Sequence, residues 1–243
     1  MFALWKKELM SFFSSITGYL VAGVFLLMTG LFLWIIPGNL NIPFGGYASL
    51  DSLFYLAPWL YLFLVPAVTM KLFSEERKSG TIELLLTKPL TDWHIVGGKY
   101  LAGVTLVVIS LLPTLIYFVS VHYLAQPVGN IDHGAIWGSY IGLVLLAAVY
   151  TSIGLFTSSL TDNQIVAFVL AVILCFLFYY GFLAMAELPV FNQVSSFLVY
   201  IGIDEHYQSI SRGVVDSRDL LYFTGLIALF LVLTKTIISS RKW

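Results

Sequence analysis

The sequence predicts an all-α, polytopic membrane protein with six spanning helices, and composition is the first reason. Of the 243 residues, 59% are hydrophobic and only 10% are charged, whereas soluble domains average about 25% charged residues. The second reason is length, because the six longest apolar runs each approach the roughly 20 residues that a helix needs to cross a bilayer. The expected spans are 16–36, 53–70, 100–121, 136–157, 165–186 and 220–239.

The charge pattern inside these runs also favours helices that lie in lipid. None of the first five contains Asp, Glu, Lys or Arg, and the sixth has only Lys235 near its end, where a long side chain can reach the headgroups. Strands of a membrane barrel would be about half as long and would alternate apolar with polar residues. No repeat or linker divides the chain, so we expect a single membrane domain over residues 1–243.

Basic residues predict the orientation of the spans. Ten of the 12 Lys and Arg residues fall at the two termini or between the second and third spans. Only Arg212 and Arg218 fall on the opposite side. Because short cytoplasmic loops carry the excess of Lys and Arg, both termini are expected in the cytoplasm. Lys6 and Lys7 do not indicate a cleaved signal peptide, because the apolar run that follows them is too long.

Residues 2–13 are expected to form a separate amphipathic helix before the first span. Apolar side chains recur there at spacings of three and four, and the charged residues fall between them. Such a helix lies in the membrane surface with its apolar face toward the lipid. A frayed terminal tail is the other interpretation.

The segment between the second and third spans, residues 71–99, carries more charge than any other part of the chain. Gly80 is placed to cap a helix that has Glu83 at its third position. Pro89 disfavours helical geometry at the residue before it, so the helix is expected over 81–87.

One face of this two-turn helix is apolar, because Ile82, Leu85 and Leu86 share it. A helix this short is unstable alone in water, so these residues must pack against the chain's own helix ends or against a partner protein. A solvated connector between two spans is the structural alternative.

The same segment resembles the signature of ABC-2 type transporter permeases, whose pattern runs roughly E-x-x-x-G-T-x-E-x-L-L-x-x-P between spans two and three. The matching residues are Glu76, Gly80, Thr81, Glu83, Leu85, Leu86 and Pro89. The resemblance implies that they form a coupling helix docked on a separate ATP-binding subunit. It also implies a bacterial inner-membrane location and a second permease subunit, identical or related, because six spans are half of the usual transport unit.

Two further segments are interpreted through this resemblance. The break between spans four and five has Thr161, Asp162 and Gln164, where Thr161 and Gln164 fit a capping box and the family implies a minor contact with the ATPase. The outer segment before the last span is similar to gliding-motility-associated permeases of Bacteroidetes at His206, Gln208, Ser209, Arg212, Gly213, Asp216 and Tyr222. Phe197, Tyr200 and Arg212 are candidates for an outer gate there. A short re-entrant or interfacial helix over 197–203 is expected to be buried in the outer mouth of the bundle. A lid that only shields the helix ends is the alternative.

Several function classes lack their motifs. No G-x-x-x-x-G-K-[ST] pattern occurs, so ATP and Mg²⁺ are expected on the partner subunit, with no cofactor and no enzyme activity in this chain. No metal site is expected, and the net charge of −1 gives no reason to expect a nucleic-acid partner. Two alternatives stay open, namely a secondary transporter and a membrane scaffold for a motility or secretion complex that transports nothing.

Overall fold

The computed structural model describes residues 1–86, 90–213 and 216–240, and every regular element within these ranges is helical. The long helices are α1 (Phe2–Phe13), α2 (Ile16–Gly30), α4 (Asp51–Thr69), α7 (Asp92–Leu111), α8 (Leu115–Leu124), α9 (His133–Leu160), α10 (Gln164–Phe176) and α14 (Ser217–Ser239). The short ones are α3 (Ile42–Gly45), α5 (Lys71–Lys78), α6 (Thr81–Leu86), α11 (Phe182–Ala186), α12 (Ser195–Ile201) and α13 (Ile203–Ser211). Short π turns η1 (Leu31–Ile35) and η3 (Leu177–Gly181), and 3-10 turns η2 (Leu112–Thr114) and η4 (Pro189–Phe191), extend or join them.

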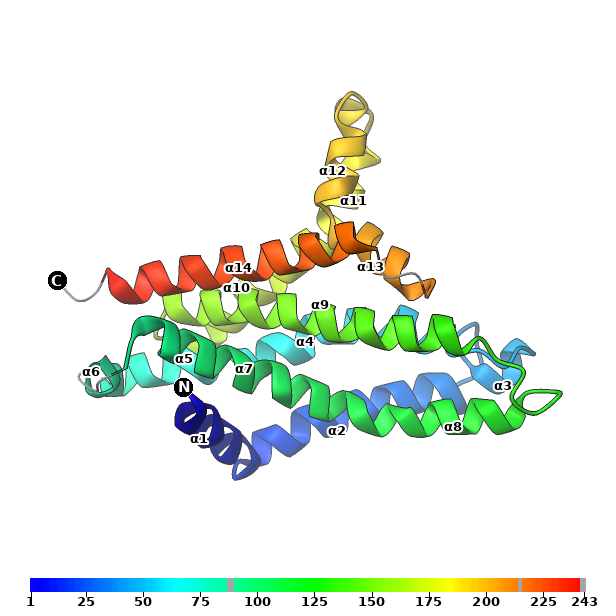
Figure 1. The fold of residues 1–243 in the computed structure, drawn as a ribbon, viewed down its shortest axis with the longest axis horizontal. Helices are drawn as coiled ribbons and strands as arrows, with labels where there is room; N and C mark the ends of the chain where they lie inside the picture. Colours follow the sequence, from blue (N-terminus) through cyan, green and yellow to red (C-terminus); the bar gives the residue numbers. More distant parts are fainter. Residues whose placement is uncertain (87–89, 214–215, 241–243) are drawn as a thin grey trace.

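Six helical segments are long and apolar enough to cross a membrane, which confirms the predicted fold class. They are Gly18–Ile35, Asp51–Lys78, Asp92–Leu124, His133–Leu160, Gln164–Ala186 and Ser217–Ser239. Figure 1 shows them as an elongated bundle. The N-terminus, the last turn of α14, α1 and α6 lie toward one end of this bundle, here called the α6 end, and α3, α8 and α13 lie toward the other, the α13 end.

Helix α9 is the most buried span and forms the axis of the bundle, with α4, α7, α10, α13 and α14 packed around it. Small residues allow this close approach, as is usual where helices pack in lipid. Gly154 is the clearest case, because a Cβ atom there would lie 2.0 Å from Oγ1 of Thr69 on α4. A side chain at this position would push α4 away from the axis.

The third span begins earlier than the apolar run predicts. Helix α7 starts at Asp92, capped by the Thr91 hydroxyl, which accepts a hydrogen bond from the backbone N–H of His94 at 3.3 Å. Lys99, expected in the connecting segment, is therefore a helical residue and is fully buried. The burial of Lys99 was not expected, because an unpaired lysine normally ends a membrane span, whereas this lysine is neutralised by partners from other elements.

The prolines inside the second and third spans have different effects on their helices. Pro113 lies in η2, which interrupts the third span between α7 and α8. Pro58 and Pro66 lie inside α4, which continues without interruption to Thr69 before α5 begins.

The start of the fifth span differs from the predicted capping box. The side-chain oxygen of Asn163, not that of Thr161, accepts from the backbone N–H groups of Ile165 and Val166, at 2.9 and 3.5 Å. Thr161 instead accepts from the backbone N–H of Asn163, which shapes the turn. The helix starts at Gln164, so Thr161 lies too far upstream to cap it.

The outer segment corrects another expectation. Helices α11 and α12 project sideways from the bundle (Figure 1), and no residue of α12 is buried. The expectation of a buried helix over 197–203 is therefore wrong for α12, because an apolar segment of this length can face lipid as well as protein. Helix α13 is the element that packs on α9, through Ile203, Tyr207 and Ile210 among its buried residues.

A buried polar pair holds α13 to the last span. Nδ1 of His206 lies 2.7 Å from Oδ1 of Asp219 on α14, and Nε2 lies 3.1 Å from the carbonyl oxygen of Tyr200. The ring of Tyr222 stacks on the imidazole with 3.9 Å between centroids. These contacts fix the position of α13 at one end of the bundle.

Candidate functional site

Helix α5 extends the second span beyond Met70 and is fastened to the end of α9. The Ser158 hydroxyl accepts hydrogen bonds from the backbone N–H groups of Phe73 and Ser74, at 3.0 and 3.1 Å. It also donates to the carbonyl oxygen of Met70 at 2.9 Å. The first N–H groups of a helix have no partner within it, so Ser158 supplies from another span the cap that α5 lacks.

A second contact joins the far end of α5 to the same region. The Arg77 guanidinium donates from Nη1 to the backbone oxygen of Ser159. Because α9 is the axis of the bundle, these contacts connect α5 directly to the most buried span.

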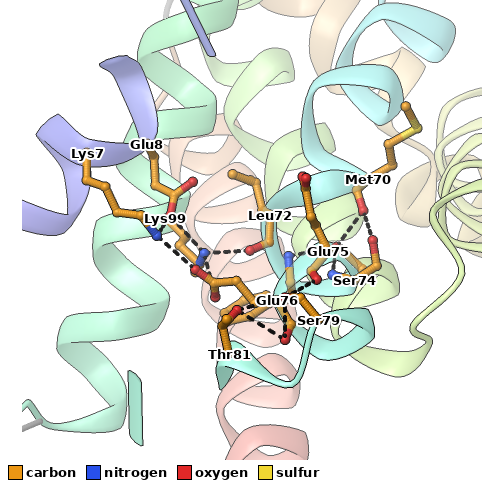
Figure 2. Close-up of polar contacts among 12 residues, drawn as sticks. Lys7, Glu8, Met70, Leu72, Ser74, Glu75, Glu76, Ser79, Thr81 and Lys99 are labelled. Carbon is orange, nitrogen blue, oxygen red and sulfur yellow. Dashed lines mark hydrogen bonds and ion pairs between the residues drawn. The ribbon is translucent and has the colours of Figure 1, made fainter. Parts of the chain in front are cut away.

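Glu76 anchors the opposite face of α5 through a group of four charges, which we call the four-charge cluster: Lys7, Glu8, Glu76 and Lys99 (Figure 2). Oε2 of Glu76 lies 3.0 Å from Nζ of Lys99 on α7, and Oε1 lies 3.1 Å from Nζ of Lys7 on α1. Oε1 of Glu8 lies 2.9 Å from Nζ of Lys99 and 3.5 Å from Nζ of Lys7. The cluster therefore joins three elements that are distant in sequence.

Lys99 is the centre of this cluster because its side chain has no exposed surface. Its Nζ also donates to the carbonyl oxygen of Leu72 at 2.5 Å and lies 5.2 Å from the centre of the Phe73 ring. A buried charge that loses its partner typically destabilises a protein by about 3–5 kcal/mol. The arrangement therefore favours one fixed position of α5 against α1 and α7.

Lys7 lies at the rim of the cluster, with 60% of its side chain exposed. Partial burial lowers its pKa, but the neighbouring carboxylates of Glu8 and Glu76 outweigh this and raise the pKa above 10.5. Lys7 therefore stays charged at neutral pH. Its pairs contribute little, because exposed ion pairs are worth about 0–1 kcal/mol.

A tight turn connects α5 to α6. Gly80 has φ +70°, a conformation that residues with a Cβ atom rarely adopt. The hydroxyls of Ser79 and Thr81 lie 2.8 Å apart across the turn, and the Thr81 hydroxyl donates to the carbonyl oxygen of Glu76 at 3.4 Å. The start of α6 is thus bonded to the residue that anchors α5 in the four-charge cluster.

The predicted coupling residues differ in exposure. Glu83 on α6 is exposed, whereas Ile82 packs with Leu90 against a small core cluster formed by α1, α5, α7, α9 and α14. Glu76 faces the chain's own lysines, and 14% of its side chain is exposed. Leu85 and Leu86 belong to α6, but their side chains, and all of Pro89, lie outside the described residues.

The break between spans four and five lies beside α5. Asp162, Asn163 and Gln164 line a hollow of about 510 Å³ together with Lys78 at the end of α5. The two segments that the sequence singles out at this side of the membrane therefore share one end of the bundle.

The three proposed outer-gate residues do not share one site. Phe197 and Tyr200 lie on α12, each 66% exposed, whereas Arg212 follows α13 and lines a cavity between α4, α9 and α13. Within the described ranges, no hydrogen bond or ring contact joins Arg212 to either aromatic residue.

Sequence reasoning missed most of the residues that hold α5, although one signal was present. Gly97 and Gly98 precede Lys99, and a Cβ atom at Gly98 would lie 3.2 Å from the backbone oxygen of Met1 and 3.3 Å from the Leu4 side chain. The glycines therefore let α1 approach α7 closely enough for Glu8 to reach Lys99. The role of Ser158 had no comparable signal.

Comparison with known families identifies the class of protein. The family model for ABC-2 family transporter proteins matches residues 61–240, which includes α5, α6, part of the second span and all of the four spans that follow. A search of curated proteins finds no match. Because the family model matches most of the chain and includes the candidate site, the chain belongs to the ABC-2 family of transporter proteins.

Proposed function

We propose that the chain is the permease subunit of an ATP-driven transporter and that α6 is the coupling helix that contacts a separate ATP-binding subunit. The observation that carries this proposal is the attachment of α6, with its exposed Glu83, to three parts of the bundle through α5. The four-charge cluster joins α5 to α1 and α7, and Ser158 with the Ser159 carbonyl joins it to α9. A rigid attachment of this kind transmits a displacement without absorbing it.

Nucleotide binding and hydrolysis belong to the partner, which holds ATP and Mg²⁺. Closure of two ATP-binding subunits would push α6. Helix α5 would move with it, because the Thr81 hydroxyl is hydrogen-bonded to the backbone oxygen of Glu76. The buried Lys99 then carries the displacement to α7, while Ser158 carries it to α9. In this mechanism Glu76 acts inside the chain, and the exposed Glu83 is the acidic contact with the partner.

The remaining features of the proposal follow from the charge distribution and the family. Both termini, α5 and α6 face the cytoplasm of a bacterial inner membrane, because the basic residues concentrate there. Two permease subunits, identical or related, form the transport pathway and move their cargo outward. Gliding-motility machinery is the proposed cellular setting, supported by the resemblance of the outer segment alone.

Photo-cross-linking tests the partner contact directly. A photoreactive phenylalanine derivative replaces Glu83 in the full chain, and irradiation of native membranes is followed by mass spectrometry of the adducts. We expect an adduct with a soluble nucleotide-binding protein. The matched control replaces Glu205, an exposed glutamate on α13 at the opposite end of the bundle, and should give no such adduct. Equal labelling from both positions, or none from position 83, would refute the coupling role of α6.

A second measurement distinguishes a permease from a scaffold that transports nothing. A scaffold could hold the same partner, but it would not change the partner's rate of ATP hydrolysis. Measurement of ATPase activity of the purified complex, with and without the chain in lipid, therefore separates a permease from a scaffold.

A further inference from the structure

A cavity opens at the α13 end of the bundle, away from α6. It has a volume of about 780 Å³, within the range of about 300–1,000 Å³ that is usual for sites that hold small molecules. Asp51, Tyr55 and Trp59 of α4 line it at intervals of four residues, which places them on one face of that helix. The facing wall comes from η3, α9 and α13.

Two carboxylates and one guanidinium group line this cavity, so the net charge of its lining is −1. Asp204 on α13 accepts a hydrogen bond from Gln208 at 2.7 Å, but neither it nor Asp51 forms an ion pair within the described ranges. Arg212 also lines the cavity, yet its guanidinium Nε donates to the carbonyl oxygen of Gln208 instead. The cavity therefore has an excess of negative charge that a bound cation would balance.

Aromatic rings form the other part of the lining. The ring of Trp59 lies 5.7 Å from that of Tyr179 and 5.6 Å from that of Tyr180, so the three make one continuous aromatic wall. Tyr55 lies one helical turn before Trp59 and is 65% exposed. Aromatic faces attract organic cations, by about 0.5–1 kcal/mol when exposed and about 2 kcal/mol or more when water is excluded.

We propose that this cavity binds an organic cation, either a protonated amine or a quaternary ammonium group. The carboxylates of Asp51 and Asp204 supply the opposite charge, and the wall of Trp59, Tyr179 and Tyr180 contacts the apolar part of the ligand. A neutral sugar would also stack on these rings, but it would leave the net charge of −1 unbalanced. The inference rests on the proposed permease function and deepens it, because such a cation would belong to the class of molecules that the permease moves. Binding of the cation itself requires no ATPase.

Choline and its neutral isostere 3,3-dimethyl-1-butanol test this proposal, because they differ at one atom and in charge. Binding to the purified full chain in a non-ionic detergent is measured by ligand-observed NMR. We expect choline to bind roughly tenfold more tightly than the alcohol, as expected for a partly desolvated cation near aromatic rings. Equal binding of the two, or binding of neither, would overturn the proposal.

Substitutions locate the site. Asp204→Asn keeps an oxygen that can accept from Gln208 but removes the charge, and we expect it to weaken choline binding roughly tenfold. Asp51→Asn, at an exposed position that poses little risk to folding, should weaken it less. Asp162→Asn at the α6 end is the matched control and should leave binding unchanged. Unchanged binding in both the Asp204 and Asp51 variants would show that choline binds elsewhere.

The choline experiment and the cross-linking experiment can fail independently of each other. Choline binding without an adduct at position 83 would support the cavity and refute the coupling role of α6. An adduct without choline binding would give the opposite result.

Discussion

Glu76→Gln is the substitution that best tests the role of the four-charge cluster. It keeps the size of the side chain and one oxygen acceptor, but it removes the charge that lies 3.0 Å from the buried ammonium group of Lys99. Hydrogen bonds to charged groups contribute about 1.5–3 kcal/mol. The full cost of about 3–5 kcal/mol for an unpaired buried charge is not reached, because Glu8 stays 2.9 Å from Lys99.

We therefore expect a loss of about 2 kcal/mol for Glu76→Gln, within a range of about 1–3 kcal/mol. For a chain of this length, 1 kcal/mol corresponds to a change in melting temperature of about 2–4 °C, so the expected decrease is about 4–8 °C. Thermal unfolding of the purified chain in detergent measures it.

Lys7→Gln is the matched control, because Lys7 pairs with the same Glu76 carboxylate but is 60% exposed. Its expected cost is below about 1 kcal/mol, since solvent screens an exposed ion pair. A decrease in melting temperature as large for Lys7→Gln as for Glu76→Gln would refute the reasoning from burial.

A double-substitution cycle isolates the central pair. Lys99→Met replaces the buried ammonium with an apolar side chain of similar length, and it is combined with Glu76→Gln. Because the two groups are in contact, the double variant should lose less than the sum of the single losses. Additive losses would show that Glu76 and Lys99 do not stabilise each other.

Three further outcomes are expected at other places in the fold. Ser158→Ala leaves two backbone N–H groups of α5 without their acceptor and should cost about 1–3 kcal/mol in thermal unfolding, whereas Ser159→Ala should have little effect because only its backbone oxygen binds Arg77. His206→Phe preserves the stacked ring but leaves buried Asp219 without its partner, and it should increase proteolysis around α13 at a cost of about 1–3 kcal/mol. Burial raises the pKa of Asp204 above 3.8, while hydrogen bonds from Tyr179 and Gln208 lower it and the nearby charge of Glu205 raises it. Choline binding measured by NMR should therefore weaken as the pH falls through this raised pKa, and the Asp204→Asn variant should lose that part of the pH dependence.

Much of the fold was predictable because membrane spans follow from long apolar runs. The six span-length helices, the helix α1 and the short helix that begins at Thr81 all follow from local sequence patterns, and the structure confirms each of them as a helix. The burial of Lys99 was not predictable, because a lysine normally marks the end of an apolar span. Its neutralisation depends on Glu8 and Glu76, which lie far from it in the sequence.

The short helix of the candidate site was predictable, but the direction that each side chain faces was not. Glu76 and Glu83 both match the family pattern, yet only Glu83 is exposed, whereas Glu76 pairs inside the chain. A charge in a polar segment gives no indication of which partner it has. The role of Ser158 was not predictable either. A serine near the end of a span usually donates a hydrogen bond to a backbone oxygen of its own helix, whereas Ser158 caps α5.

The direct test of the permease assignment is co-purification of the tagged chain from native membranes under gentle conditions, with the bound proteins quantified by mass spectrometry. We predict a stoichiometric ATP-binding protein that is lost in Glu83→Lys and retained in Glu205→Lys, with the same melting temperature for both variants and the unchanged chain. An ATP-binding protein that is absent from the unchanged chain, or that stays bound to Glu83→Lys as firmly as to the control, would contradict the role of α6 as the coupling helix.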